Sequence, residues 1–333
     1  MVMEWACLYM MPGGMILFVT LEGCWNMDLT NIEFINDAAI NRRRYWTNEI
    51  VKLSGHFVND SSRVEEEIIY EVSKSGSQAL LDHLRLCTAI PESYEHDSSE
   101  EKLYSKYTDA LISECFKFFG LNSIVLTERA DAADVEVVCD SYSFVADAKV
   151  FRLSRTAKNQ KDFKVQAMDG WRNTKDFAMV VCPIYQLPVK SSQIYQQAIL
   201  RNVCVFTYTH LAVLVKYADI VGSDVRILLE EIFRSVILMN PSKDSVQYWT
   251  MINRTMLNYD KRIEKLWIDE RIATSEGIYV LKKMAIEYLS SERGRILSMS
   301  REEAVRALIK MNKIESRIEQ IKKVTDNNIL SLK

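Results

Sequence analysis

Three short apolar segments follow one another in the middle of the chain, and they constrain its fold more than any other feature. They cover residues 123–127, 133–138 and 143–149, and each has the length of a β-strand. The gap at residues 139–142 is short enough to turn the last two segments into a hairpin. We therefore expect a small β-sheet at the centre of the chain.

The segment before this sheet predicts an amphipathic helix. Its apolar residues recur near the helical period, so that one face is buried, and Gly120 supplies a C-terminal stop. The polar residues 95–100 before it form a loop and N-cap region, and Glu101 lies in the first turn, where the helix dipole favours an acid. Glu114 falls on the apolar side and needs either a partner or a position at the rim. The periodic residues are Leu103, Tyr107, Ala110, Leu111, Cys115 and Phe118.

Helices and strands alternate after these three strands, which is typical of an α/β core. The apolar runs at residues 177–182 and 203–207 predict two more strands. Helical patterns occupy residues 158–172, 191–200 and 211–217. With the first helix and the first three strands, they predict one mixed α/β domain of ordinary size.

Helical patterns flank this core on both sides. Residues 1–90 contain an irregular apolar extension, residues 1–25, followed by helices, and the core then covers residues 91–220. Residues 221–333 contain only helices, and residues 300–303 form a capping box. The expected C-terminal helices are residues 224–237, 244–257, 260–290, 301–311 and 313–325, with a break in the third near Gly277.

The composition excludes several classes of protein. Hydrophobic residues make up 48% and charged residues 26% of the chain, as in an ordinary globular protein. The seven cysteines are scattered without a C-x-x-C, and the four histidines are isolated from one another. This pattern argues against a disulfide scaffold, a zinc site and a Cys–His nucleophile. The scattered cysteines lead us to expect a reducing cytoplasm. No stretch approaches the ~20 apolar residues of a membrane helix.

Charge is unevenly distributed along the chain. The net charge is −3, yet the stretch from Lys149 to Lys175 carries eight basic residues against two acids, a local charge of +6. Such a patch, rather than the net charge, is what meets phosphate groups.

The third strand segment ends in Asp147, Ala148 and Lys149, and Asp134 stands in the second segment. Side chains two residues apart on a strand share a face, so Asp147 and Lys149 project together and Asp134 can converge on them. Hard cations such as Mg²⁺ prefer carboxylate and carbonyl oxygens, including the carbonyl of Ala148, and they promote attack of water on a phosphodiester. Lys149 would then orient that water or help to deprotonate it. The pattern favours metal-dependent cleavage with Asp134, Asp147 and Lys149 as catalytic residues.

A structural interpretation of the same residues stays open at this point. Lys149 can simply pair with Asp147 or Asp134 at a solvated strand end. Against this, an acid inside an apolar strand costs several kcal/mol unless it is paired or binds a metal. Two such acids, followed by a basic segment, leave the metal site and the ion pair equally open from the pattern alone.

The basic segment that follows Lys149 predicts contacts with DNA. Arginine suits guanine edges, and asparagine or glutamine suits adenine edges, in the major groove. Serine, threonine and lysine suit the phosphates. The alternative is the charged, exposed start of a helix. The candidate residues are Arg152, Ser154, Arg155, Thr156, Lys158, Asn159, Gln160, Lys161 and Lys164.

The chain resembles the HindIII family of type II restriction endonucleases. The sequence Val-Ala-Asp-Ala-Lys at residues 145–149 and the basic segment at residues 151–165 carry the resemblance, which is strong over about residues 92–220. A run of this length is far more specific than the Asp-x-Lys pattern. Further matching stretches are residues 101–106, 192–194, 210–212 and, more weakly, 301–304.

This resemblance implies a PD-(D/E)xK nuclease core, a mixed sheet flanked by helices. It also implies Mg²⁺, a homodimer, and cleavage of double-stranded DNA at a palindrome, AAGCTT in that family, leaving 5′-phosphate ends. A DNA methyltransferase that protects the host site is implied as a functional partner.

The resemblance also assigns individual residues. Asp134, Asp147 and Lys149 take the three motif positions, and Ala133 stands where the motif has its proline. Glu101 matches the acid on the helix before the core sheet, and it joins Asp134, Asp147 and the Ala148 carbonyl as an expected metal ligand.

Two other functions stay open from the sequence. One is a DNA-binding relative that keeps the fold without cleavage, although all three motif residues are present. The other is a nuclease of the same fold without sequence specificity, such as a repair or junction-resolving enzyme. Discrete fragments from a DNA digest would exclude the second.

Overall fold

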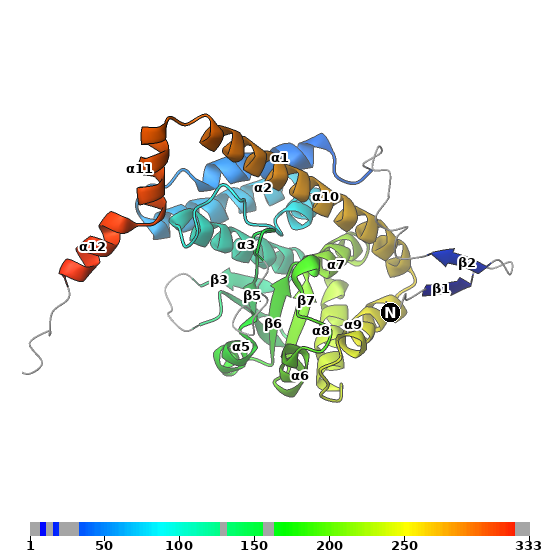
Figure 1. Cartoon of the computed structure of the whole chain (residues 1–333). Coiled ribbons are helices and arrows are strands. Elements are labelled where there is room, and N and C mark those ends of the chain that lie inside the picture. The colour runs from blue at the N-terminus through cyan, green and yellow to red at the C-terminus, as the bar shows by residue number, and fades with distance from the viewer. Residues whose placement is uncertain (1–6, 11–15, 20–32, 127–131, 156–162, 324–333) are drawn as a thin grey trace, which may run out of the picture. The chain divides into compact units, whose positions relative to one another are not determined.

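The computed structural model describes residues 7–10, 16–19, 33–126, 132–155 and 163–323 (Figure 1). The chain divides into two compact units, Met1–Leu281 and Lys282–Lys333. None of the helices that the structure describes combines the length and the apolar character needed to cross a membrane.

A five-stranded mixed sheet forms the centre of the first unit. Its order follows the sequence, β3-β4-β5-β6-β7. The first three strands run antiparallel and the last three run parallel, so β5 belongs to both halves. The predicted mixed sheet and the predicted hairpin between the second and third segments are confirmed. The strands are β3 (Asn122–Val125), β4 (Val135–Val138), β5 (Ser143–Ala148), β6 (Phe177–Cys182) and β7 (Val203–Thr207).

Strands β6 and β7 are the most deeply placed part of this sheet. Every residue of Phe177–Cys182 and Val203–Thr207 is buried, as expected for parallel strands with both faces covered. Both strands have the predicted bounds, because a continuous apolar run is the sequence signature of such strands.

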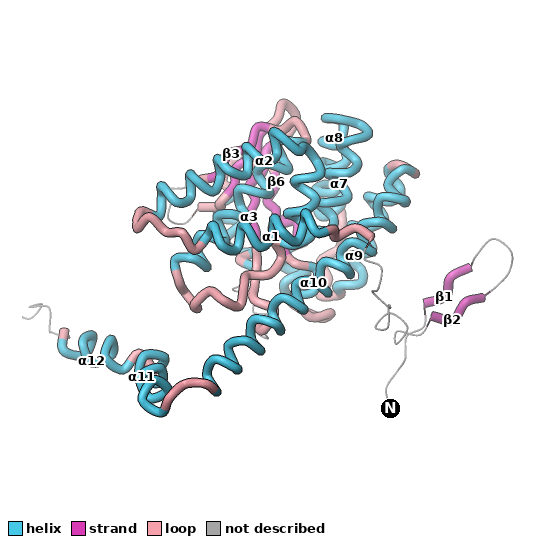
Figure 2. The backbone as a smooth tube through the Cα atoms, turned by 90° about the horizontal axis from the view of Figure 1, so that it is seen from above, coloured by secondary structure: helices cyan, strands magenta, loops and turns pink. Residues whose placement is uncertain are grey.

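Helices cover the sheet on two sides. Figure 1 shows α1 (Asp37–Ile50), α2 (Phe57–Leu86) and α3 (Ser99–Phe118) on one side, and α5 (Val165–Arg172) and α6 (Gln193–Leu200) on the other. Seen from above, α2 and α3 overlie the strands (Figure 2). Further helices of the first unit are α7 (Tyr208–Val221), α8 (Val225–Ile237) and α9 (Ser245–Tyr259).

Helix α3 packs over β3, β4 and β5 and so places its residues beside the strand ends. It begins at the predicted cap, where Ser98 Oγ accepts the N–H of Glu101, and ends before Gly120, which has a φ of +78°. Residues 107–116 are all buried. Glu114 is among them, and its partner is Lys117, with Oε1 and Nζ 2.7 Å apart.

Helix α10 (Arg262–Leu297) corrects one prediction. The expected break near Gly277 is wrong, since the helix continues through this residue. Gly277 instead permits a close approach to the end of α2, because a Cβ at this position would lie 2.7 Å from the carbonyl oxygen of Arg85. Nearby, the buried carboxylate of Glu270 accepts hydrogen bonds from Arg85 Nε (3.1 Å) and Nη2 (2.5 Å).

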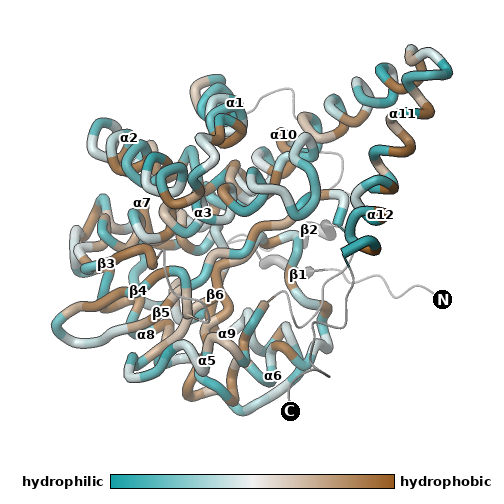
Figure 3. Tube along the Cα trace, turned by 90° about the vertical axis from the view of Figure 1, so that its left-hand side faces the viewer, coloured by the Kyte–Doolittle hydropathy of each residue, from teal (hydrophilic) through white to brown (hydrophobic). Residues whose placement is uncertain are grey.

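The second unit contains the end of α10, α11 (Arg301–Met311) and α12 (Ile314–Lys322). The predicted capping box of α11 is confirmed, with Ser300 as N-cap and Glu303 as its partner. Neither α11 nor α12 buries a residue, and hydrophobic residues recur along α11 among hydrophilic ones (Figure 3).

A two-stranded antiparallel hairpin, β1 (Cys7–Met10) and β2 (Ile16–Val19), stands near the start of the chain. The rest of the expected extension, residues 1–25, lies outside the described residues.

Candidate active site

Three carboxylates meet at one end of the central sheet. Asp134 directly precedes β4, Asp147 is the fifth residue of β5, and Asp109 comes from α3. One oxygen of each carboxylate lies within 4.8 Å of the others. Asp109 and Asp147 are 2% and 1% exposed, so water does not stabilise their charges.

The strand register explains why the first two meet. Val135 pairs with Ala146 in the antiparallel ladder of β4 and β5. Continuing that register by one position sets Asp134 opposite Asp147. Asp109 reaches the same point from the helix above, and its Oδ1 accepts the backbone N–H of Ala148 at 3.2 Å.

Lys149 completes this group. Its Nζ contacts Asp147 Oδ2, and its side chain is only 12% exposed. Its backbone is fixed on both sides, since its N–H donates to the Val181 carbonyl (2.7 Å) and its carbonyl accepts the hydroxyl of Tyr208 (3.1 Å). Ala148, whose backbone carbonyl is a further expected metal ligand, lies between Asp147 and Lys149 in the chain.

The electrostatics of the group are those of crowded, buried acids. Burial and the neighbouring Asp134 raise the pKa of Asp147 to about 6, although Lys149 opposes the shift. Burial, together with Asp134 and Asp147, also raises the pKa of Asp109 well above its usual range. Burial acts to raise the pKa of Asp134 too, but a hydrogen bond with Asp147, together with Lys106 and Lys149, lowers it below its usual value.

The donor set fits a hard divalent cation. Carboxylate oxygens are the ligands that Mg²⁺ and similar ions prefer, and three converge here. Asp147 Oδ2 is buried, and the ammonium of Lys149 is its cationic partner. Buried carboxylates cost free energy unless cations neutralise them, and here two lysines face three carboxylates. Asp109, Asp134 and Asp147 are thus the residues that could hold a metal here.

The model of the HindIII restriction endonuclease family matches residues 44–325. The chain belongs to the HindIII restriction endonuclease family. A member of known function, the Type II restriction enzyme HindIII of Haemophilus influenzae, is 34% identical over 270 residues, which span 76% of this chain and 86% of that enzyme. The resemblance predicted from the sequence is confirmed, and the protein is a restriction endonuclease that hydrolyses double-stranded DNA.

Asp109 is the residue of this HindIII-family site that sequence reasoning missed. A signal was present, because Asp109 lies within the periodic apolar helix, where a buried acid needs a partner. Glu101, the expected ligand, lies two turns earlier on α3 and is not part of the three-carboxylate group. It accepts the N–H of Asp97 at 2.7 Å and, with His96 and Asp97, forms a separate, more exposed group with metal-ligand spacing.

The predicted DNA-contacting segment begins next to the site, and its described residues have partners within the chain. Arg152 donates to the carbonyl oxygens of Tyr94 (2.5 Å) and Glu95 (3.0 Å). Ser154 Oγ donates to Glu92 at 2.8 Å, and the guanidinium of Arg155 lies over the ring of Phe151. Lys164 Nζ lies 5.1 Å from the centre of the Trp171 ring. Thr156, Lys158, Asn159, Gln160 and Lys161 lie outside the described residues.

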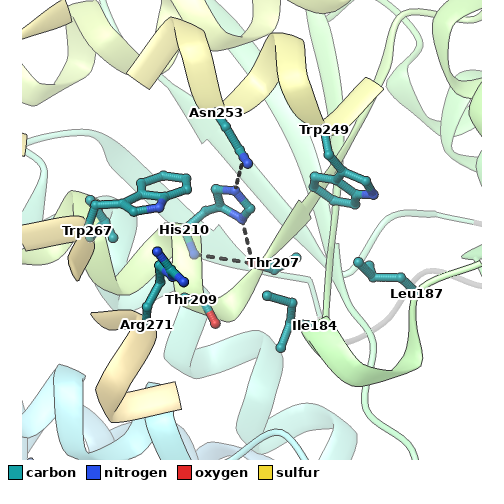
Figure 4. Close-up of a pocket in the computed structure, with 10 residues that line it drawn as sticks. Ile184, Leu187, Thr207, Thr209, His210, Trp249, Asn253, Trp267 and Arg271 are labelled. Atoms are coloured by element: carbon teal, nitrogen blue, oxygen red, sulfur yellow. Dashed lines mark hydrogen bonds between the residues drawn. The ribbon is translucent and has the colours of Figure 1, made fainter. Parts of the chain in front are cut away.

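A separate cavity of about 380 Å³ opens at the carboxyl ends of β6 and β7 in this HindIII-family fold (Figure 4). Trp249 and Trp267 form part of its wall, and none of the three carboxylates lines it. His210, also in the wall, is held between Thr207 Oγ1 (2.6 Å from Nδ1) and Asn253 Oδ1 (3.0 Å from Nε2). The cavity and the carboxylates thus occupy the same edge of the sheet at different strands.

Proposed function

We propose that this HindIII-family enzyme cleaves double-stranded DNA at a short palindrome in a Mg²⁺-dependent reaction. AAGCTT is the first sequence to test, and the products would carry 5′-phosphate and 3′-hydroxyl ends. The observation that carries the proposal is the group of Asp109, Asp134 and Asp147 with Lys149 beside it.

Each residue has a role that follows from its position. The three carboxylates hold the cation, with the Ala148 carbonyl as a further oxygen at the same strand end. A bound Mg²⁺ supplies Lewis acidity at the phosphoryl oxygens. Lys149 is held against Asp147 and by its own backbone bonds, so its ammonium group is fixed where it can orient the attacking water. Asp109 supports this geometry through its bond to the Ala148 N–H.

For DNA binding, we propose that the segment at residues 151–165 follows the duplex next to the cut site. Its net positive charge favours the phosphates, and its Arg, Asn and Gln residues are suited to base edges. Arg152 would act mainly by holding the segment to residues 94–95, because its guanidinium is already bonded there.

We propose three regions in the chain: a nuclease core at residues 91–220, and helical regions at residues 1–90 and 221–333.

We further propose a homodimer, in which each subunit cuts one strand. A two-fold dimer reads a palindrome because its symmetry matches that of the site. The second unit supports this, because its described part leaves many apolar side chains exposed, and such patches mark interaction surfaces. They are Ile286, Leu289, Ile296, Leu297, Val305, Leu308, Ile309, Met311, Ile314, Ile318 and Ile321.

A restriction endonuclease would destroy the DNA of its own host unless the sites there were modified. We therefore propose a partner DNA methyltransferase of the same sequence specificity. We also propose a cytoplasmic location. Host DNA lies there, and a reducing compartment keeps thiols such as those of the described cysteines reduced.

The direct test of this function is a digest of a DNA of known sequence, followed by sequencing of the cut ends. We expect discrete fragments that all end within one palindrome, only in the presence of Mg²⁺. Cuts at unrelated sequences would favour the non-specific nuclease. Binding of DNA without cleavage, in every divalent cation tried, would favour a DNA-binding relative that has no nuclease activity.

A further inference from the structure

A second lysine, Lys106, contacts the carboxylates at residues other than the one that Lys149 contacts. Lys106 lies on α3, one turn before Asp109. Its Nζ contacts Asp134 Oδ1 and is 3.8 Å from Asp109 Oδ2. Its side chain is 20% exposed, so the ammonium is partly screened from water and depends on these carboxylates.

The ammonium of Lys106 and the carboxylates of Asp109 and Asp134 neutralise one another. Lys106 pairs with Asp134 and lies close to Asp109, so its ammonium places a positive charge beside the acids. Lys106 contacts Asp134, which is the most exposed of the three carboxylates, since Asp109 and Asp147 are buried.

The charge balance shows what this lysine does. Lys106 adds one positive charge to the three carboxylates, beside the charge of Lys149. Without Lys106 the group would be more negative by one charge. An added divalent cation is therefore attracted less strongly when Lys106 is present, and it must also share or take over an oxygen of Asp134 that the ammonium already contacts.

We propose that Lys106 is the built-in counter-ion of the metal-free site, which a divalent cation displaces from Asp134. It is a positioning residue that sets how much free metal the enzyme requires. This inference rests on the proposed metal site, and it adds a competing group that the Asp-x-Lys motif does not contain.

The test measures metal binding in the absence of DNA. Mn²⁺, which shares the oxygen-ligand preference of Mg²⁺, is titrated into the full chain, and free Mn²⁺ is counted by electron paramagnetic resonance. We expect Lys106→Met to bind Mn²⁺ about tenfold more tightly than the wild type, because a competing cation is gone. Lys106→Arg, which keeps the charge, is expected to retain wild-type affinity.

Lys102→Met is the matched control, because Lys102 lies one turn earlier on the same helix and is exposed. It should bind Mn²⁺ like the wild type. Unchanged or weaker binding by Lys106→Met would overturn the inference. Asp147→Asn tests the proposed metal site separately from the role of Lys106. If this variant binds Mn²⁺ as well as the wild type, the proposed metal site itself is refuted.

Thermal unfolding provides a second readout if Lys106→Met is less stable than the wild type. Without metal, the variant holds three carboxylates against one lysine, and added Mn²⁺ relieves more repulsion. The increase in melting temperature on adding Mn²⁺ should thus be larger in Lys106→Met than in Lys102→Met. An equal or smaller increase would contradict the counter-ion role.

Discussion

Buried acids are costly, and the candidate active site of this enzyme gathers three acids. The arrangement makes sense only if cations neutralise it, first the lysines and then a metal. Asp109 is central because it binds the Ala148 N–H as well as facing Asp134 and Asp147. Its role can be separated from that of Glu101, which lies outside the group.

At this scale we predict that Asp109→Asn lowers the single-turnover cleavage rate about 100-fold, the cost typical of disturbing a group that supports a metal site. The asparagine keeps an acceptor for the Ala148 N–H but replaces the other carboxylate oxygen, a candidate metal ligand, by an NH2 group. Glu101→Gln is the matched control on the same helix and should cleave nearly as fast as the wild type. A larger loss in Glu101→Gln than in Asp109→Asn would reverse the assignment.

His210 gives a pH prediction that is independent of the metal. Burial lowers its pKa to about 4, whereas an unfolded histidine has a pKa near 6.5. The folded protein binds fewer protons than the unfolded chain between these values. The stability that His210 contributes is therefore present above pH 6.5 and is lost as the pH falls toward 4.

We expect the free energy of unfolding to fall by about 2 kcal/mol more in the wild type than in His210→Gln between pH 7 and pH 5. Urea unfolding of both proteins at the two pH values measures this difference, and comparing losses cancels the titration of other groups. Equal losses would show that His210 does not titrate as its burial requires.

The sequence could name Asp134, Asp147 and Lys149 as candidates because each stands in or beside a recognisable strand. It could not show that they meet, since that depends on the pairing of Val135 with Ala146. Asp109 was missed for a related reason. Periodicity identifies the buried face of α3, but not which buried residue the strand ends will meet.

At the scale of elements, Gly277 marks the contact between α10 and α2. We predict that Gly277→Ala destabilises the protein by about 1–3 kcal/mol, because the new Cβ collides with the Arg85 carbonyl. Gly294→Ala, in the same helix with nothing within 4 Å of its Cβ, should leave the melting temperature unchanged or raise it. Calorimetry of both variants measures the contrast, and similar effects at the two positions would contradict the close approach.

The elements themselves were largely predictable. Strands β6 and β7 have the expected bounds, and α3 begins and ends at the expected cap and glycine. The continuity of α10 through Gly277 was not predicted, because a glycine that allows two helices to approach closely looks, in the sequence, like one that ends a helix. Only the position of Arg85 distinguishes the two cases.

At the scale of the molecule, the helices of residues 282–323 are expected to hold two subunits together. Leu308→Lys combined with Ile318→Lys should weaken dimerisation at least about tenfold, because two exposed apolar contacts are replaced by charges. Analytical ultracentrifugation measures the change. Arg306→Ala, on the same helix and exposed, is the control, and an unchanged dimer in the double variant would place the interface elsewhere.

The central claim is that the carboxylate group with Lys149 performs the cleavage. Its most direct measurement is single-turnover cleavage of a duplex by purified Asp147→Ala and Lys149→Ala, with DNA binding followed by gel shift on the same samples. We predict that both variants bind the duplex as the wild type does and that neither cuts it. Cleavage by Asp147→Ala at a rate near that of the wild type would contradict the account.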